Sequence, residues 1–172
     1  MKSTLKKIIV VVLVLGLGSL TYSLYKKIDA KNTNANNIAS IPGFSYTTLN
    51  GLPFTNKHLV KNTPTVFIYF NSECDFCQHE AQDISSNIDQ LQNLQLLFIS
   101  QENVSIINQF ATQHQLNNLK KITFLHDSTG DFARQFDTST IPTILVYDER
   151  QNLFKKHKGQ LNSKGILKIL NH

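Results

Sequence analysis

The chain is organised around the stretch Asn71-Ser72-Glu73-Cys74-Asp75-Phe76-Cys77-Gln78-His79-Glu80. It follows an apolar run, Thr65 to Phe70, whose β-branched and aromatic residues predict a central strand buried on both faces. It opens a segment with helical spacing of apolar residues, from about Asp75 to Leu91. Cys74 and Cys77 are the only cysteines in the chain. Two thiols three positions apart at a strand-to-helix junction are placed to interconvert between a dithiol and a disulfide.

The two cysteines are expected to have different roles. A helix N-terminus offers unpaired backbone N–H groups and a partial positive charge, which favour a thiolate at Cys74. Cys74 is therefore the predicted nucleophile, and Cys77, one turn further in, is predicted to resolve the mixed disulfide. The alternatives are a structural disulfide, two incidental thiols or half of a zinc site. Zinc would need two further ligands, which His79 alone does not supply, so we expect no metal and no cofactor beyond the Cys74–Cys77 disulfide.

The rest of the chain predicts alternating strands and helices. Residues 44–49 predict an edge strand, and Asn50-Gly51 after them is a turn signal. The later predicted elements are strands over 94–100, 122–126, 143–147 and 153–158, and helices over 104–115, 130–136 and 163–170. This order implies an α/β fold with a central mixed β-sheet flanked by helices.

The N-terminal segment predicts one transmembrane helix. Three lysines precede an uncharged run, Ile8 to Tyr25, which just spans a ~30 Å bilayer core at ~1.5 Å per residue if flanking groups snorkel. A cleaved signal peptide is the alternative, but the small-x-small sites after the run are poor. We expect an uncleaved anchor over 1–25, a flexible tether over 26–40 and a domain over 41–172. The short basic N-terminus favours a domain outside the cytoplasm, at the inner membrane.

The charge pattern separates the N-terminal segment from the domain. Of the 17 Lys and Arg residues, six lie within residues 1–31 beside a single acid, and the remaining 11 are balanced by 11 acids. The basicity is therefore no sign of nucleic-acid binding. No Lys or Arg lies between Lys61 and Lys120, an interval that contains six acids. The surface near the cysteines is expected to be acidic, either as a solvated face or as a surface that selects basic protein partners.

A strand leads into the C-x-x-C motif and a helix, and much later Ile141-Pro142-Thr143 precedes a core strand and a hairpin. This order of predicted elements resembles the thioredoxin superfamily. The chain looks most like the membrane-anchored, extracytoplasmic thiol–disulfide oxidoreductases of the TlpA type, which include reductases of cytochrome c maturation. The resemblance covers roughly Ile41 to His172. It implies a thioredoxin-like fold in which Pro142 is cis and lies against the disulfide, while the backbone of Thr140, Ile141 and Pro142 binds an extended substrate. An ordinary proline at the start of a strand is the alternative.

The resemblance also assigns a role to Glu80, three residues after Cys77. Cytochrome-maturation reductases carry a functional glutamate there, which implies a partly buried acid that shuttles protons to or from Cys77. A solvated helix residue is the alternative. The chain departs from the family in having no Trp, with Glu73 before Cys74 and Asp75-Phe76 between the cysteines. These extra acids oppose thiolate formation and predict a more reducing pair.

The predicted function is reduction of disulfides in secreted or periplasmic proteins, apocytochrome c among the candidates, with electrons from a membrane thiol relay. A disulfide oxidase or isomerase shares the same chemistry in the opposite direction. A copper-handling chaperone would use His126 or His157 with the cysteines, but such proteins separate their cysteines by three residues. A peroxiredoxin-like peroxidase would have Pro and Thr where this chain has Phe67 and Asn71.

Overall fold

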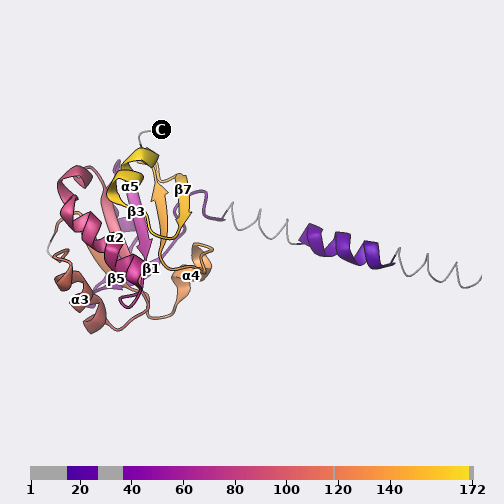
Figure 1. Cartoon of the computed structure of the whole chain (residues 1–172), viewed down its shortest axis with the longest axis horizontal. Coiled ribbons are helices and arrows are strands. Elements are labelled where there is room, and N and C mark those ends of the chain that lie inside the picture. Colours follow the sequence, from indigo (N-terminus) through magenta and orange to yellow (C-terminus); the bar gives the residue numbers. More distant parts are fainter. Residues whose placement is uncertain (1–14, 27–36, 118, 171–172) are drawn as a thin grey trace, which may run out of the picture. The chain divides into compact units, whose positions relative to one another are not determined.

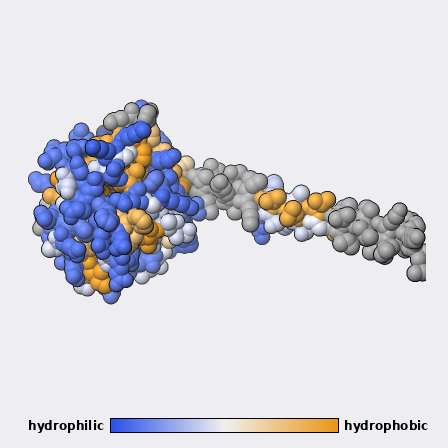
Figure 2. All heavy atoms as spheres, in the orientation of Figure 1, coloured by the Kyte–Doolittle hydropathy of each residue, from blue (hydrophilic) through white to orange (hydrophobic). Residues whose placement is uncertain are grey.

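The computed structural model describes residues 15–26, 37–117 and 119–170. The chain divides into two compact units, Met1–Asn36 and Asn37–His172. In the first unit residues 15–26 are helical, and hydrophobic side chains lie beside more polar ones along this helix (Figures 1 and 2). Among the residues described, no helix is both long and apolar enough to cross a membrane. Much of the predicted anchor and most of the predicted tether lie outside the described residues.

The second unit is built on one mixed sheet of seven strands, in the order β2-β1-β5-β4-β3-β6-β7 (Figure 1). Its strands are β1 (Ser45–Thr48), β2 (Pro53–Thr55), β3 (Thr65–Tyr69), β4 (Gln95–Ser100), β5 (Ile122–His126), β6 (Thr143–Tyr147) and β7 (Leu153–Lys158). The central strands β3, β4 and β5 are parallel, and β6 runs antiparallel to β3. Every residue of β3, β4 and β6 is buried, as their nearly continuous apolar sequences predict.

Helices cover both faces of the sheet. On one face, apolar residues of α2 (Asp75–Ser86), α3 (Val104–Gln113) and α5 (Ser163–Leu170) join a core with alternate residues of the central strands. On the other face, α4 (Asp131–Gln135) contributes Phe132 to an aromatic core around Phe67. The predicted α/β sandwich with a mixed sheet is confirmed.

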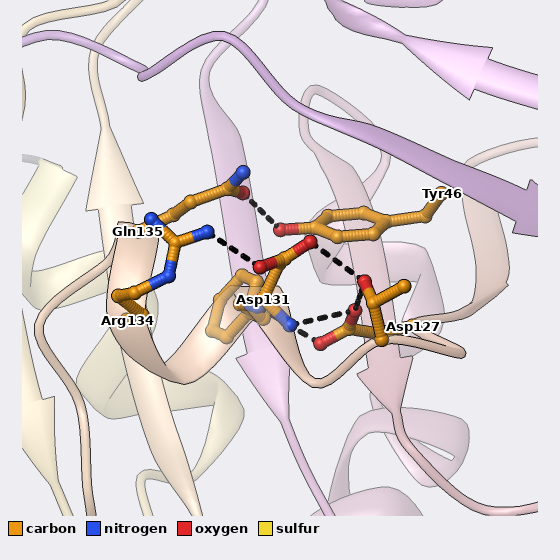
Figure 3. Close-up of polar contacts among 7 residues, drawn as sticks. Tyr46, Asp127, Asp131, Arg134 and Gln135 are labelled. Atoms are coloured by element: carbon orange, nitrogen blue, oxygen red, sulfur yellow. Dashed lines mark hydrogen bonds and ion pairs between the residues drawn. The ribbon is translucent and has the colours of Figure 1, made fainter.

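The polar contacts in Figure 3 fix α4 on its face of the sheet. The buried carboxylate of Asp127 accepts hydrogen bonds from the backbone N–H groups of Asp131 (3.0 Å) and Phe132 (2.9 Å). The hydroxyl of Tyr46 on β1 donates to the side-chain oxygen of Gln135 at 2.7 Å. The two bonds to Asp127 satisfy N–H groups that a helix start leaves unpaired, and all three bonds hold the helix that precedes the Pro142 loop.

Three differences from the sequence prediction have a clear structural cause. The edge of the sheet is β2 and not β1, because Pro53–Thr55 pairs outside β1. The helix after the cysteines ends at Ser86 and continues as a 3-10 turn over Ile88–Leu91. The domain begins at Asn37 instead of 41, because Ile38 is buried in the aromatic core and its carbonyl accepts a hydrogen bond from the Tyr147 hydroxyl at 3.2 Å.

Candidate active site

The cysteine pair lies where β3 leads into α2. Cys74 is the N-cap residue of α2, with an extended backbone, and its carbonyl accepts bonds from the backbone N–H groups of Cys77 (2.9 Å) and Gln78 (3.0 Å). Both cysteines are free thiols; Cys74 is half-buried, whereas Cys77 is only 2% exposed. The two thiols thus differ in accessibility. An incoming disulfide has access to Cys74 and not to Cys77, which suits Cys74 for the first attack.

The loop in front of Cys74 is fixed by its neighbours. The Glu102 carboxylate, which follows β4, accepts hydrogen bonds from the Ser72 backbone N–H (2.7 Å) and hydroxyl (2.5 Å). The side chain of Gln78, in the first turn of α2, donates to the Ser72 carbonyl at 2.9 Å. The backbone of Asn71 accepts a bond from the Cys74 N–H at 3.2 Å. Ser72 is therefore held on both sides, which restricts where the backbone places Cys74.

Glu80 is fully buried on the inner side of α2, so the alternative of a solvated helix residue is wrong. Its Oε1 accepts one long hydrogen bond, from the Leu161 backbone N–H at 3.3 Å. Its Oε2 has no hydrogen-bond partner among the described residues. Burial raises the pKa of Glu80 to about 8, which the hydrogen bond from Leu161 only partly opposes. At neutral pH this acid is therefore mainly protonated and able to exchange its proton.

The Cys77 thiol is also biased toward its protonated form. Burial raises the pKa of Cys77 far above its ordinary value, a backbone hydrogen bond with Asn71 lowers it, and the neighbouring Cys74 and Glu80 charges raise it further. Cys77 thus needs a nearby base before it can act as a nucleophile. Glu80 is close enough to influence the Cys77 charge and has a pKa in the range that such a base requires.

The Pro142 loop meets the same end of the sheet. Tyr69, the last residue of β3, pairs with Thr143, the first residue of β6. The cysteine loop, which follows β3, and the Pro142 loop, which precedes β6, therefore lie at the same end of two adjacent strands. The Ile141–Pro142 peptide bond is cis, as the resemblance implied. The Thr138 hydroxyl donates to Thr143 Oγ1 (2.7 Å), and the Thr143 hydroxyl donates to the Thr140 carbonyl (2.6 Å). Thr138 and Thr143 are both buried, and their hydroxyls fix the loop on its inner side. Substrate binding by Thr140, Ile141 and Pro142 stays a prediction.

Two large apolar side chains near these loops are exposed. Phe76, between the cysteines, is 62% exposed, and Ile141 is 37% exposed. Solvent-facing side chains of this size are suited to contact with a partner. His79 is exposed on the helix. In the part of the chain that the structure describes, no group of three or more His, Cys, Asp or Glu side chains is arranged to hold a metal ion.

Two features of the site were not predicted from sequence. One is the Glu102–Ser72 contact, which joins residues from separate loops and has no signature in either stretch. The other is the buried hydroxyl pair of Thr138 and Thr143. Its only sequence signal is threonine at positions flanking Ile141-Pro142, and threonines are also common in exposed loops.

The comparisons with known proteins agree with this geometry. Residues 39–156 match the model of a protein family described as the AhpC/TSA family. No curated protein sequence matches the chain. Several solved structures share its fold. A secreted Mycobacterium tuberculosis disulfide oxidoreductase, described as homologous to E. coli DsbE, is 19% identical with a TM-score of 0.63, over 78% of this chain and 96% of that one.

Two further structures show the same fold. StoA from Bacillus subtilis is 19% identical with a TM-score of 0.60, over 76% of this chain and 98% of that one. The exposed lipoprotein thioredoxin Etrx1 from Streptococcus pneumoniae is 17% identical with a TM-score of 0.59, over 75% of this chain and 98% of that one. At these identities the likeness establishes a thioredoxin-like fold.

Proposed function

The chain belongs to the AhpC/TSA family and is a thiol–disulfide oxidoreductase of the thioredoxin type, and we propose that it reduces disulfides of proteins outside the cytoplasm. The observation that carries this proposal is the pairing of a half-buried Cys74 with a buried Cys77 beside a buried Glu80. An accessible nucleophile, a protected resolving thiol and an internal base are the three parts that disulfide reduction needs.

The first step is attack of the Cys74 thiolate on one sulfur of the substrate disulfide. A Cys74–substrate disulfide forms, the substrate S–S bond breaks, and the first substrate sulfur leaves as a thiolate that takes a proton from solvent. The start of α2 favours the attacking thiolate, because its N–H groups point toward the N-cap position. The backbone at the Pro142 loop is proposed to bind the substrate chain beside Cys74.

In the second step the fraction of Glu80 that is ionised takes the proton of Cys77, and the Cys77 sulfur attacks Cys74. The Cys74–Cys77 bond forms, the mixed disulfide breaks, and the second substrate sulfur leaves and is protonated. Two electrons have then passed from the protein to the substrate. An external dithiol donor, which we propose to be a membrane thiol relay, restores the reduced pair by the same exchange in reverse.

The direction of electron flow depends on thiolate stability. Strongly oxidising pairs have a reduced form stabilised by a low-pKa thiolate. Here burial and the Glu80 charge raise the pKa of Cys77, and Glu73 and Asp75 flank Cys74 with negative charge. A Cys77 thiol that resists ionisation favours the disulfide, which makes the dithiol a better reductant. The extracytoplasmic location is supported by the N-terminal sequence pattern and by fold neighbours described as secreted or exposed.

Peroxidase chemistry has less support. The peroxiredoxin pattern of Pro and Thr ahead of the reactive cysteine is replaced by Phe67 and Asn71. Phe67 is fully buried and packs on Phe136 with ring centroids 5.0 Å apart, so it contributes no group to the site.

The proposal is tested by insulin reduction and by the reduction potential of the full chain. We expect catalysed insulin reduction with dithiothreitol as donor, its loss in Cys74→Ser, and trapped mixed disulfides in Cys77→Ala. The potential should lie nearer thioredoxin, at about −270 mV, than the strong oxidant DsbA, at about −120 mV. An inactive wild-type protein would contradict the oxidoreductase assignment, whereas an active protein with a potential near that of DsbA would contradict only the direction.

A further inference from the structure

A groove of about 320 Å³ lies beside the nucleophile and is not used in the mechanism above. One wall is formed by the cysteine loop and the residue that holds it, namely Ser72, Glu73 and Glu102. The other wall is formed by one side of α3, through Ile106, Gln109, Phe110 and Gln113. Glu73, which lines the groove, directly precedes Cys74. When a substrate cysteine is bonded to Cys74, the substrate residues next to that cysteine would therefore lie at the groove.

The groove combines negative charge with an apolar wall. Glu73 is exposed, and Glu102 is fixed in place by its bonds to Ser72 and by a further bond from the Ser100 hydroxyl at 3.1 Å. Within residues 37–117 and 119–170, neither carboxylate forms an ion pair with a Lys, Arg or His side chain. Ile106 is 38% exposed, which leaves aliphatic surface beside the charges.

The surroundings do not neutralise this charge. The sequence has no Lys or Arg between Lys61 and Lys120, so no Lys or Arg side chain lies on the cysteine loop, α2 or α3, and the exposed His79 of α2 does not line the groove. The start of α3 offers only a partial positive charge of about half an elementary charge, which is less than the two full negative charges. The groove therefore favours a cation over a neutral or negative group.

We propose that this groove binds a lysine or arginine side chain of the substrate, located within a few residues of the cysteine that Cys74 attacks. A basic side chain of this length lays its methylene stem along an apolar wall while its charged end reaches acidic groups. Ile106 and Phe110 supply the wall, and Glu73 and Glu102 supply the acidic groups. The inference rests on the proposed reductase function and names the substrates of that site as disulfides flanked by basic residues.

The test uses peptide disulfides that differ in one residue. Each peptide carries arginine or its neutral isostere citrulline at one of the three positions on either side of its cysteine. The rate constant for reduction by the reduced full-length protein is measured in single turnover at low and high salt. At the preferred position the arginine peptide should react about three to ten times faster, and salt should reduce the ratio, as expected for a partly exposed ion pair.

Two matched variants separate the groove from the overall charge of the protein. Gln109→Lys places a cation in the groove on an exposed helix position and should abolish or invert the preference for arginine. Gln82→Lys adds the same charge on an exposed position of α2 outside the groove and should keep the wild-type ratio. Glu73→Gln should lower the ratio in part; Glu102 is left unchanged because it also holds Ser72.

The outcomes distinguish this inference from the proposed function. If arginine and citrulline peptides are reduced at equal rates at all six positions, the proposed role of the groove is wrong and the proposed reductase function stands. An equal effect of Gln82→Lys and Gln109→Lys would assign the preference to the general field of the protein and also overturn the groove. A wild-type protein that reduces no peptide at all would overturn the proposed function and the groove together.

Discussion

The carboxyl group of Glu80 is fully buried. One of its two oxygens has no hydrogen-bond partner among the described residues. Its pKa rises from 4.5 to about 8 on folding, mainly through burial. The native state therefore holds the Glu80 proton more tightly than the unfolded chain does. Its contribution to stability is complete below pH 4.5 and is lost as the pH rises through about 8.

This predicts a pH-dependent effect of Glu80→Gln. Near pH 5 the variant and the wild type should be similarly stable, because both carry a neutral side chain of the same shape. Near pH 9 the variant should be the more stable by several kcal/mol, since each pKa unit corresponds to about 1.4 kcal/mol. Urea unfolding at both pH values measures the difference. Glu73→Gln, a change of an exposed acid, serves as the control, and a parallel pH profile for wild type and Glu80→Gln would contradict the prediction.

The position of Glu80 was visible in the sequence, but its environment was not. The helical spacing of apolar residues in α2 places Glu80 next to Ala81 and in line with Cys77 and Ile84, which already indicates the inner face. Its complete burial depends on the Leu161 segment, which packs over it from a distance of 81 residues in the chain. A single sequence does not contain that contact, whereas Cys74 and Cys77 are local and could be predicted as a pair.

At the level of secondary structure, α4 depends on Asp127. This short helix has no side-chain cap of its own at Gly130, and two of its first N–H groups are bonded by the buried Asp127 carboxylate instead (Figure 3). The helix in turn holds Phe132 against Tyr69, with ring centroids 5.0 Å apart. Loss of the carboxylate leaves buried N–H groups unpaired at the start of the helix.

We predict that Asp127→Ala lowers the free energy of unfolding by about 1–3 kcal/mol, the usual cost of a lost cap with unsatisfied N–H groups. Asp127→Asn should lie between the wild type and Asp127→Ala, because its amide oxygen still accepts a hydrogen bond. The midpoint of urea unfolding is the measurement. Asp131→Ala, which removes a mainly solvent-exposed pair with Arg134, is the control and should change the midpoint little. Equal losses for Asp127→Ala and Asp131→Ala would show that the cap is unimportant.

The elements that sequence predicted well are those whose pattern is local. β3, β4 and β6 are uninterrupted apolar runs, and their observed bounds lie within one residue of the predicted ones. The end of α2 was missed because Ile84, Ile88 and Leu91 continue the helical spacing beyond Ser86. The side-chain amide of Asn87 donates a hydrogen bond to the Asp83 carbonyl at 2.8 Å. A side-chain bond of this kind competes with the backbone bonds of the helix, which gives way to a 3-10 turn at this point.

For the whole molecule, the order of strands was only partly predictable. Alternating strands and helices imply parallel neighbours, which β3, β4 and β5 are. The position of β1 between β2 and β5 is set by a turn at Asn50-Gly51 and by packing of Tyr46 against Phe132, which lie far apart in the sequence. The same kind of distant contact explains why the domain was predicted to start too late.

The start of the domain gives a last prediction, tested by fragments 37–172 and 43–172. The additional residues place Ile38 and Ile41 in the aromatic core, at 4% and 8% exposure. They also bond to the hairpin between β6 and β7, through the Ala39 carbonyl with the Leu153 N–H (2.8 Å) and the Ile41 N–H with the Gln151 carbonyl (3.2 Å). Burial of two isoleucines contributes about 3–6 kcal/mol, which is a large part of an ordinary domain's stability.

Fragment 37–172 should therefore unfold cooperatively and keep insulin reductase activity, because it contains the complete second unit. Fragment 43–172 should be less stable by several kcal/mol in urea, and its near-ultraviolet circular dichroism should show loosened aromatic packing. The double variant Ile38→Ala, Ile41→Ala in fragment 37–172 should reproduce most of this loss, whereas Leu52→Ala, at an exposed leucine, should not. Equal stability of the two fragments would mean that residues 37–42 do not contribute to the stability of the domain.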